Sequence, residues 1–137
     1  NAYTCTECGR CTSSCPANIT GKKLSPRKIM MDTRDRLVEV GNNIDANKGV
    51  FVPDNKTLLN DYITPEELWA CTSCNACVEE CPVNISPLSI IMDMRRYLVM
   101  EQSAAPMSLN AMMTNVENNG APWQYSQQDR LNWKNEN

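Results

Sequence analysis

All eight cysteines of this 137-residue chain belong to two strings that have the same internal spacing. Each string has the form C-x2-C-x2-C-x3-C-P, and together the strings cover residues 5–16 and 71–82. A cubane cluster needs one thiolate on each of its four irons, and cysteines three apart in a tight loop can reach different irons. This spacing, closing proline included, is that of known [4Fe–4S] ligand runs. The sequence therefore predicts two [4Fe–4S] clusters, which exchange single electrons.

The fourth cysteine of each string decides how the two clusters share their ligands. In proteins with two such clusters, this cysteine ligates the cluster of the other string. One cluster is therefore assigned to Cys5, Cys8, Cys11 and Cys81. The other cluster is assigned to Cys71, Cys74, Cys77 and Cys15. Because shared ligands would tie the two strings together, we expect cluster binding to contribute to the free energy of folding.

Three other uses of the cysteines compete with the clusters. Structural zinc prefers two C-x2-C pairs separated by a long spacer. Here four cysteines lie within eleven residues, twice, and the chain has no histidine. A disulfide framework would need an oxidising compartment, and eight unliganded core thiols at this spacing would be a coincidence. A zinc-binding structural or interaction module is the alternative that we keep beside the clusters.

Composition argues against several other classes of protein. The net charge is −3 at pH 7 and the sequence has no basic stripe, so no nucleic-acid partner is expected. No apolar run reaches the length of a membrane span, and no signal peptide is visible. Eight thiols that serve clusters indicate a reducing compartment, and a cytoplasmic location is expected. The chain begins Asn-Ala rather than with methionine, which suits a piece of a longer protein.

The two halves of the sequence match beyond their cysteines. Residues 15–20 align with residues 81–86 at an offset of 66, and residues 26–34 align with residues 87–95 at an offset of 61. The difference, 66 − 61, is five, and residues 21–25 are the insertion in the first copy. An internal duplication with pseudo-two-fold symmetry around the two clusters is the simplest interpretation.

Helix start signals recur after each string. Ser25 and Pro26 suit the N-cap and first position of a helix, and Gly41 is its predicted end. Ser86 and Pro87 repeat this start in the second copy. In each copy apolar residues then fall on one helical face: Met30, Met31, Leu37 and Val38 in the first, and Ile91, Met92, Leu98 and Val99 in the second.

Two further helices and one hairpin are predicted. Thr64 and Glu67 have the spacing of a capping box, which would begin a short helix leading to the second string. Residues 106–118 carry an apolar stripe at helical spacing, and Gly120 is expected to end that helix. Residues 50–59 predict a short β-hairpin.

Three segments carry a resemblance to a known family: residues 68–83 (LWACTSCNACVEECPV), 94–99 (MRRYLV) and 117–123 (ENNGAPW). Together with the paired strings, they resemble the α-helical ferredoxin domain, and most of all iron–sulfur proteins like the C subunit of heterodisulfide reductase. The resemblance implies a mostly α fold, an α-helical ferredoxin. It also implies a dicluster [4Fe–4S] domain over residues 1–120 and a polar C-terminal tail or linker over residues 121–137.

The same resemblance implies an electron-transfer domain or subunit of a larger oxidoreductase, without catalytic residues of its own. Family members are fused to or partnered with a CCG-type cysteine-rich module, and this chain has no Cys-Cys-Gly. The expected partner is such a module, a flavoprotein or a quinone-linked subunit. A membrane-associated parent would place the chain at the inner face of the membrane. An enzyme in its own right is disfavoured, because every iron has a thiolate and the chain has no histidine.

Several side chains near the strings are candidates for tuning or docking. Arg34 and Arg95 occupy matching positions, and we expect either hydrogen bonds near a cluster or ion pairs with neighbouring aspartates. Ile19 and Ile85 follow the closing Cys-Pro pairs and are expected to shield a cluster from water. A group of basic residues near the first string is either a solvated face or a docking surface for an acidic partner: Arg10, Lys22, Lys23, Arg27 and Lys28.

Overall fold

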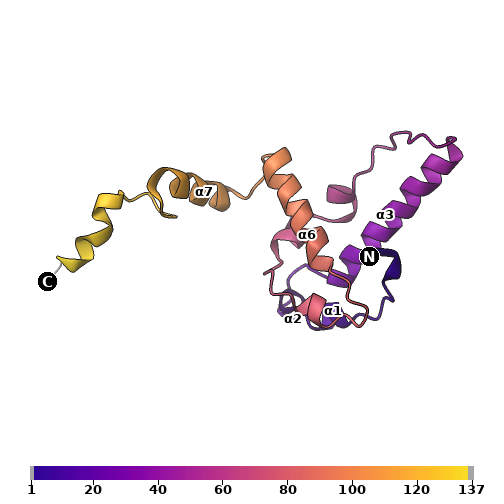
Figure 1. Cartoon of the computed structure of the whole chain (residues 1–137), viewed down its shortest axis with the longest axis horizontal. Coiled ribbons are helices and arrows are strands. Elements are labelled where there is room, and N and C mark those ends of the chain that lie inside the picture. Colours follow the sequence, from indigo (N-terminus) through magenta and orange to yellow (C-terminus); the bar gives the residue numbers. More distant parts are fainter. Residues whose placement is uncertain (1, 136–137) are drawn as a thin grey trace. The chain divides into compact units, whose positions relative to one another are not determined.

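A computed structural model describes residues 2–135 of the chain. Its contacts divide the chain into two compact units, Asn1–Tyr97 and Leu98–Asn137. Both units are helical, and no β-strand forms anywhere in residues 2–135. Figure 1 follows the helices along the chain from indigo to yellow. The expectation of a mostly α structure is confirmed.

Unit 1 places short helices at the cysteine strings and long helices after them. Its elements are η1 (Ala2–Thr4), α1 (Arg10–Ser13), α2 (Pro16–Ile19), α3 (Pro26–Ala46), η2 (Leu58–Tyr62), α4 (Pro65–Trp69), α5 (Ala76–Glu79) and α6 (Pro87–Arg96). The long helices α3 and α6 pack against each other, and α1 packs against α5. Figure 1 shows α1 and α2 together at one end of this unit. The two strings therefore meet where α3 and α6 begin.

The predicted helix starts are confirmed by their capping hydrogen bonds. The Ser25 hydroxyl accepts a hydrogen bond from the backbone N–H three residues later, and Ser86 does the same at the start of α6. At α4, Thr64 and Glu67 form the reciprocal bonds of a capping box. Each cap satisfies a backbone N–H that the first turn of a helix leaves without a partner.

The end of α3 differs from the prediction. The helix continues through Gly41 and ends at Ala46. A glycine inside a helix is unfavourable by only about 1 kcal/mol relative to alanine, so it does not have to end one. The chain turns after the helix, where Lys48 and Gly49 have φ values of 56° and 90°. The stop is this left-handed turn, which the sequence also marks with a glycine.

The predicted β-hairpin over residues 50–59 is wrong, because residues 50–57 form an irregular loop and residues 58–59 begin η2. Polar side chains of α3 form hydrogen bonds with this loop, in place of the bonds that a partner strand would have formed. Asn43 donates to the carbonyl of Val52 at 3.0 Å and accepts from its N–H at 2.9 Å. Arg36 donates to both carboxylate oxygens of Asp54, at 2.5 and 2.8 Å. With its polar groups satisfied in this way, the loop does not need a ladder of strand hydrogen bonds.

The core of unit 1 is small and aliphatic. Its largest fully buried side chains are Ile29, Met30, Ile63, Leu68, Ile91 and Pro26. The predicted apolar face of α3 is packed at Met30, whereas Leu37 and Val38 are 46% and 42% exposed. In α6 the corresponding face is buried at Ile91. The best-packed part of each long helix is therefore its beginning, next to the cysteine strings.

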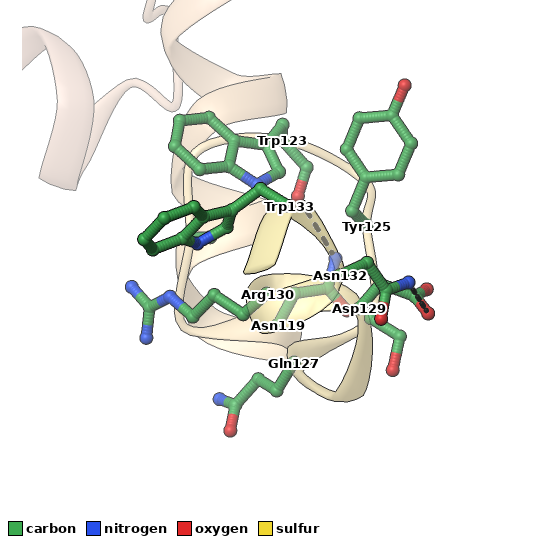
Figure 2. Close-up of a pocket in the computed structure, with 10 residues that line it drawn as sticks. Asn119, Trp123, Tyr125, Gln127, Asp129, Arg130, Asn132 and Trp133 are labelled. Atoms are coloured by element: carbon green, nitrogen blue, oxygen red, sulfur yellow. Dashed lines mark hydrogen bonds between the residues drawn. The ribbon is translucent and has the colours of Figure 1, made fainter. Parts of the chain in front are cut away.

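Unit 2 contains α7 (Met107–Asn119) and η4 (Gln127–Lys134), and η3 (Tyr97–Glu101) covers the junction in sequence. The predicted helix over residues 106–118 is confirmed to within one residue, and Gly120 ends it with a φ of 65°. Much of its apolar stripe is exposed to solvent. Figure 2 shows Trp123 and Trp133 lying beside each other next to the turn that follows α7. They line a hollow that contains none of the cysteines.

Candidate metal-cluster sites

A first cavity lies in unit 1 where the beginning of the first string meets the end of the second. Its wall contains four cysteines: Cys5, Cys8, Cys11 and Cys81. Arg27 and Met30 from α3 line it, as do Ile85 and Pro87 from the start of α6 and the turn before it. Four thiols around one space fit a polynuclear cluster with one thiolate on each iron.

In a second cavity the two strings exchange their shares: the second string contributes three cysteines and the first contributes one. Its wall contains the other four cysteines: Cys71, Cys74, Cys77 and Cys15. Leu88 and Ile91 from α6 line it, together with Leu24 and Pro26 from the start of α3 and the turn before it. In both cavities, three cysteines of one string share the wall with the fourth cysteine of the other.

The eight cysteines are free thiols, with no disulfide between them. Within residues 2–135, no group of three or more His, Cys, Asp or Glu side chains is gathered around the position of a single metal ion. The thiols surround two cavities instead. The assignment of each thiol to a cluster stays a prediction. It groups the eight cysteines in the same way as the two cavity walls do.

Most wall residues of the two cavities correspond through the sequence repeat. Glu7 and Val83 line the first cavity alone, and Pro16 lines the second alone. The offset of 66 relates the cysteines of one cavity to those of the other. The offset of 61 relates four further pairs: Arg27 and Leu88, Met30 and Ile91, Leu24 and Ile85, and Pro26 and Pro87. Within these pairs, the charge differs at Arg27 and Leu88. The two sites are therefore alike in shape and unlike in charge.

The two cysteine loops also have the same backbone conformation. Glu7 and Ser73 stand between the first two cysteines of each loop, with φ values of 55° and 57°. Gly9 and Asn75 stand between the next two, with φ values of 81° and 63°. Glycine and asparagine adopt this left-handed conformation more readily than other residues do. The loop is thus bent twice, once before and once after its second cysteine.

The acidity of the thiols follows the repeat as well. A hydrogen bond from the backbone two residues later lowers the pKa of Cys8, and an equivalent bond lowers the pKa of Cys74. Burial raises the pKa of Cys11, and it raises the pKa of Cys77 to about 11. Metal is bound by thiolate rather than thiol. We therefore expect the exposed second cysteine of each string to ionise before the third one, which is half-buried in the first string and buried in the second.

Arg34 and Arg95 hold the first turn of their respective strings. Arg34 donates to the carboxylate of Glu7 at 2.5 Å, and it also pairs with Asp35 at 3.4 Å. Arg95 donates to the carbonyl of Cys71 at 2.5 Å. The expected hydrogen bonds near the strings are therefore present for both arginines. The ion pairs expected as the alternative, with Asp32 and Asp93, do not form: Asp32 pairs with Lys28 and Asp93 with Arg96.

The two isoleucines that were expected to shield clusters differ in their surroundings. Ile85 is buried and lines the first cavity. Ile19 is 68% exposed, so the expectation for it is wrong. Leu24 takes the equivalent position in the second cavity, because the five-residue insertion displaces this part of the first copy. The place of Arg27 on the wall of the first cavity was not predicted. The available signal was the offset of 61, which pairs Arg27 with Leu88, a residue on the wall of the second cavity.

Residues 4–85 match the family described as the 4Fe-4S dicluster domain. This chain belongs to the 4Fe-4S dicluster domain family. Two [4Fe–4S] clusters are the cofactors of the family, and the eight cysteines of this dicluster domain are arranged in two groups of four. The predicted cofactors are confirmed.

Curated relatives of this dicluster domain are longer iron–sulfur proteins. It is 35% identical to a probable iron-sulfur-binding oxidoreductase, FadF, of Bacillus subtilis, over 98% of this chain and 23% of that protein. It is 35% identical to a probable membrane-anchored ferredoxin of Chromohalobacter salexigens, over 94% of this chain and 21% of that protein. It is 34% identical to the C subunit of a ferredoxin/F(420)H(2)-dependent CoB-CoM heterodisulfide reductase of Methanosarcina acetivorans, over 74% of this chain and 49% of that protein.

The chain thus spans between about a fifth and a half of the length of these relatives. The predicted resemblance to the C subunit of heterodisulfide reductase is confirmed as distant homology. In the described part of the chain, no helix combines the length and the hydropathy needed to cross a bilayer.

Proposed function

We propose that this dicluster domain relays single electrons between the redox partners of a larger oxidoreductase. One observation carries the proposal: each cavity is lined by three cysteines of one string and one of the other, so both sites lie within one small unit. When bound, [4Fe–4S] clusters supply one-electron redox chemistry. The residues of the chain hold the thiolates in place, keep water away and set the charge around each site.

The ligands of the proposed relay fall into two sets. The first set is Cys5, Cys8, Cys11 and Cys81, and the second set is Cys71, Cys74, Cys77 and Cys15. Buried apolar side chains exclude water from each site: Met30 and Ile85 at the first, and Leu24 and Ile91 at the second. The paired walls support a pseudo-two-fold arrangement of the two sites, as expected for an internally duplicated α-helical ferredoxin.

The relatives support a place for this chain within a larger assembly. One is named an oxidoreductase, one a membrane-anchored ferredoxin and one a reductase subunit. By analogy, residues 1–120 form the electron-transfer domain of a heterodisulfide reductase-like oxidoreductase, and residues 121–137 form a linker or docking tail. The partner is a fused or separate redox protein: a CCG-type cysteine-rich module, a flavoprotein or a quinone-linked subunit. Cluster thiols suit a reducing compartment, and this supports a cytoplasmic location for the domain, at the inner face of the membrane in a membrane-anchored parent.

The proposal is tested by a reductive titration of protein purified without oxygen, followed by electron paramagnetic resonance. Two clusters predict about eight irons and eight sulfides per chain, and an uptake of about two electrons. A one-electron acceptor should then reoxidise both clusters. Bound zinc without sulfide would instead identify a structural metal module. Turnover of a disulfide substrate by this chain alone would show that it is more than a relay.

A further inference from the structure

The two cluster sites differ in charge although their walls correspond. Arg27 lines the first cavity, and its counterpart in the second cavity is the apolar Leu88. Glu7 also lines the first cavity, whereas its counterpart in the repeat, Ser73, does not line the second. The wall of the first site therefore carries one cation and one anion, and the wall of the second site carries no charged residue.

The guanidinium of Arg27 has an unusual pattern of hydrogen bonds. Its Nη2 lies 3.8 Å from Oε2 of Glu7. The other oxygen of this carboxylate, Oε1, lies 2.5 Å from Nη1 of Arg34. The Nε of Arg27 is buried and has no hydrogen-bond partner, and it is the one such side-chain atom found in residues 2–135. A buried donor without an acceptor is unfavourable, because the group has lost its hydrogen bonds to water and gained none. The rest of the cavity wall is mostly apolar. A bound cluster would bring sulfur atoms, which can accept a hydrogen bond from the Nε–H of Arg27.

A positive charge acts differently on the two oxidation states of a cluster. Reduction adds one negative charge, so a nearby arginine stabilises the reduced state more than the oxidised one and raises the reduction potential. Hydrogen bonds to the sulfurs act in the same direction, and both are known determinants of cluster potential. Glu7 offsets the charge of one of the two arginines that pair with it, so the feature that distinguishes the first site is the buried Nε–H of Arg27, which has no partner. Arg95, near the second string, is matched by Arg34 near the first.

We propose that Arg27 donates its Nε–H to the cluster held by Cys5, Cys8, Cys11 and Cys81 and makes it the higher-potential cluster of the pair. Electrons that enter at either cluster then collect at this one, which is the point of exit toward the acceptor. This inference rests on the proposed function, because it uses the same ligand sets. It adds a direction of electron flow and a residue that sets it.

The test is a potentiometric titration of the 137-residue chain with both clusters bound, for wild type and for Arg27→Leu. Electron paramagnetic resonance follows the reduction of the clusters. The substitution gives the first cavity the residue that the second already has. We predict that the higher of the two midpoints falls and the lower one stays, so that the gap between them narrows. A tenfold change in the reduction equilibrium constant corresponds to 59 mV for one electron, and a shift of about this size is expected.

Two further variants separate the local effect from general ones. Lys22→Leu removes one positive charge at an exposed position on the same half of the chain and should leave both midpoints nearly unchanged. Arg27→Lys keeps the charge but lacks the Nε–H, and its midpoint should lie between those of wild type and Arg27→Leu. If Arg27→Leu does not retain its clusters, Arg27→Gln carries the same prediction with a polar side chain.

The inference is overturned if Arg27→Leu lowers the lower midpoint, or if it shifts the midpoints no more than Lys22→Leu does. In either case a protein that still takes up two electrons per chain would leave the proposed relay intact. Wild-type protein that holds no clusters at all would remove both the relay and the inference.

Discussion

At the scale of single residues, Glu67 of α4 is a buried carboxylate that joins α4 to α3. Its side chain is 4% exposed and lies 3.0 Å from the Nζ of Lys28 in α3. It also accepts hydrogen bonds from the backbone and the hydroxyl of Thr64, at 2.8 and 2.9 Å. Burial by itself would raise the pKa of Glu67, but these partners more than offset it and hold the pKa below its usual value. The capping box was predictable from sequence, whereas the lysine 39 positions away was not, because no local pattern reports a tertiary ion pair.

Replacing Glu67 with Gln should therefore weaken the attachment of α4 to α3. A hydrogen bond to a charged group contributes about 2 kcal/mol, and we expect the free energy of unfolding to fall by about this amount. Glu66→Gln is the matched control, because Glu66 is the adjacent residue and its ion pair with Lys23 is exposed at 3.6 Å. Anaerobic denaturant unfolding followed by circular dichroism measures both. Equal effects of the two substitutions would show that burial of Glu67 has no special role.

At the scale of elements, the sequence was a better guide to where helices start than to where they end. Starts depend on local side chains such as Ser25, Thr64 and Ser86, and their capping bonds are present. The end of α3 and the missing hairpin depend on distant contacts instead. Asn43 and Arg36 of α3 bind the loop that follows, and alternation of apolar residues in that loop could not reveal these bonds.

The contact between Arg36 and Asp54 should act as the main clamp on this loop. Arg36 also donates to the carbonyl of Lys56 at 2.7 Å, and it is buried. Asp54→Asn removes the charge that holds Arg36, so we expect backbone amides in residues 50–57 to exchange with deuterium several-fold faster. Clusters should remain bound, since neither residue lines a cluster cavity. Asp45→Asn, at an exposed position on α3, is the control. Unchanged exchange in Asp54→Asn would mean that other contacts hold the loop.

At the scale of the whole chain, the decisive information was already in the cysteine spacing and the repeat. Spacing alone predicted the cofactors that the family carries. The repeat offset of 61 relates wall positions of the two cavities from Pro26 onward. The place of Leu24 was not predicted, because the alignment treats residues 21–25 as an insertion and pairs Ile85 with Ile19, which is exposed. Charge was not predictable in the same way. In the sequence Arg27 is one of several basic residues near the first string, and only the fold places it on the wall of a cavity.

The crossed assignment of the eight cysteines is the central claim about this chain, and paired substitutions test it most directly. A cluster that loses one thiolate can persist in altered form, but one that loses two has only half its ligands. Under the crossed assignment, Cys8→Ser with Cys81→Ser removes two ligands from one cluster and leaves the other complete. Cys74→Ser with Cys81→Ser removes one ligand from each.

The measurement is iron and sulfide content together with electron paramagnetic resonance of the reduced protein, for both double variants prepared without oxygen. We predict that Cys8→Ser/Cys81→Ser retains about four irons and one unperturbed [4Fe–4S] signal, while Cys74→Ser/Cys81→Ser has no unperturbed signal. The reverse result, with the unperturbed cluster found in Cys74→Ser/Cys81→Ser, would show that each string binds its own cluster and would contradict the crossed assignment.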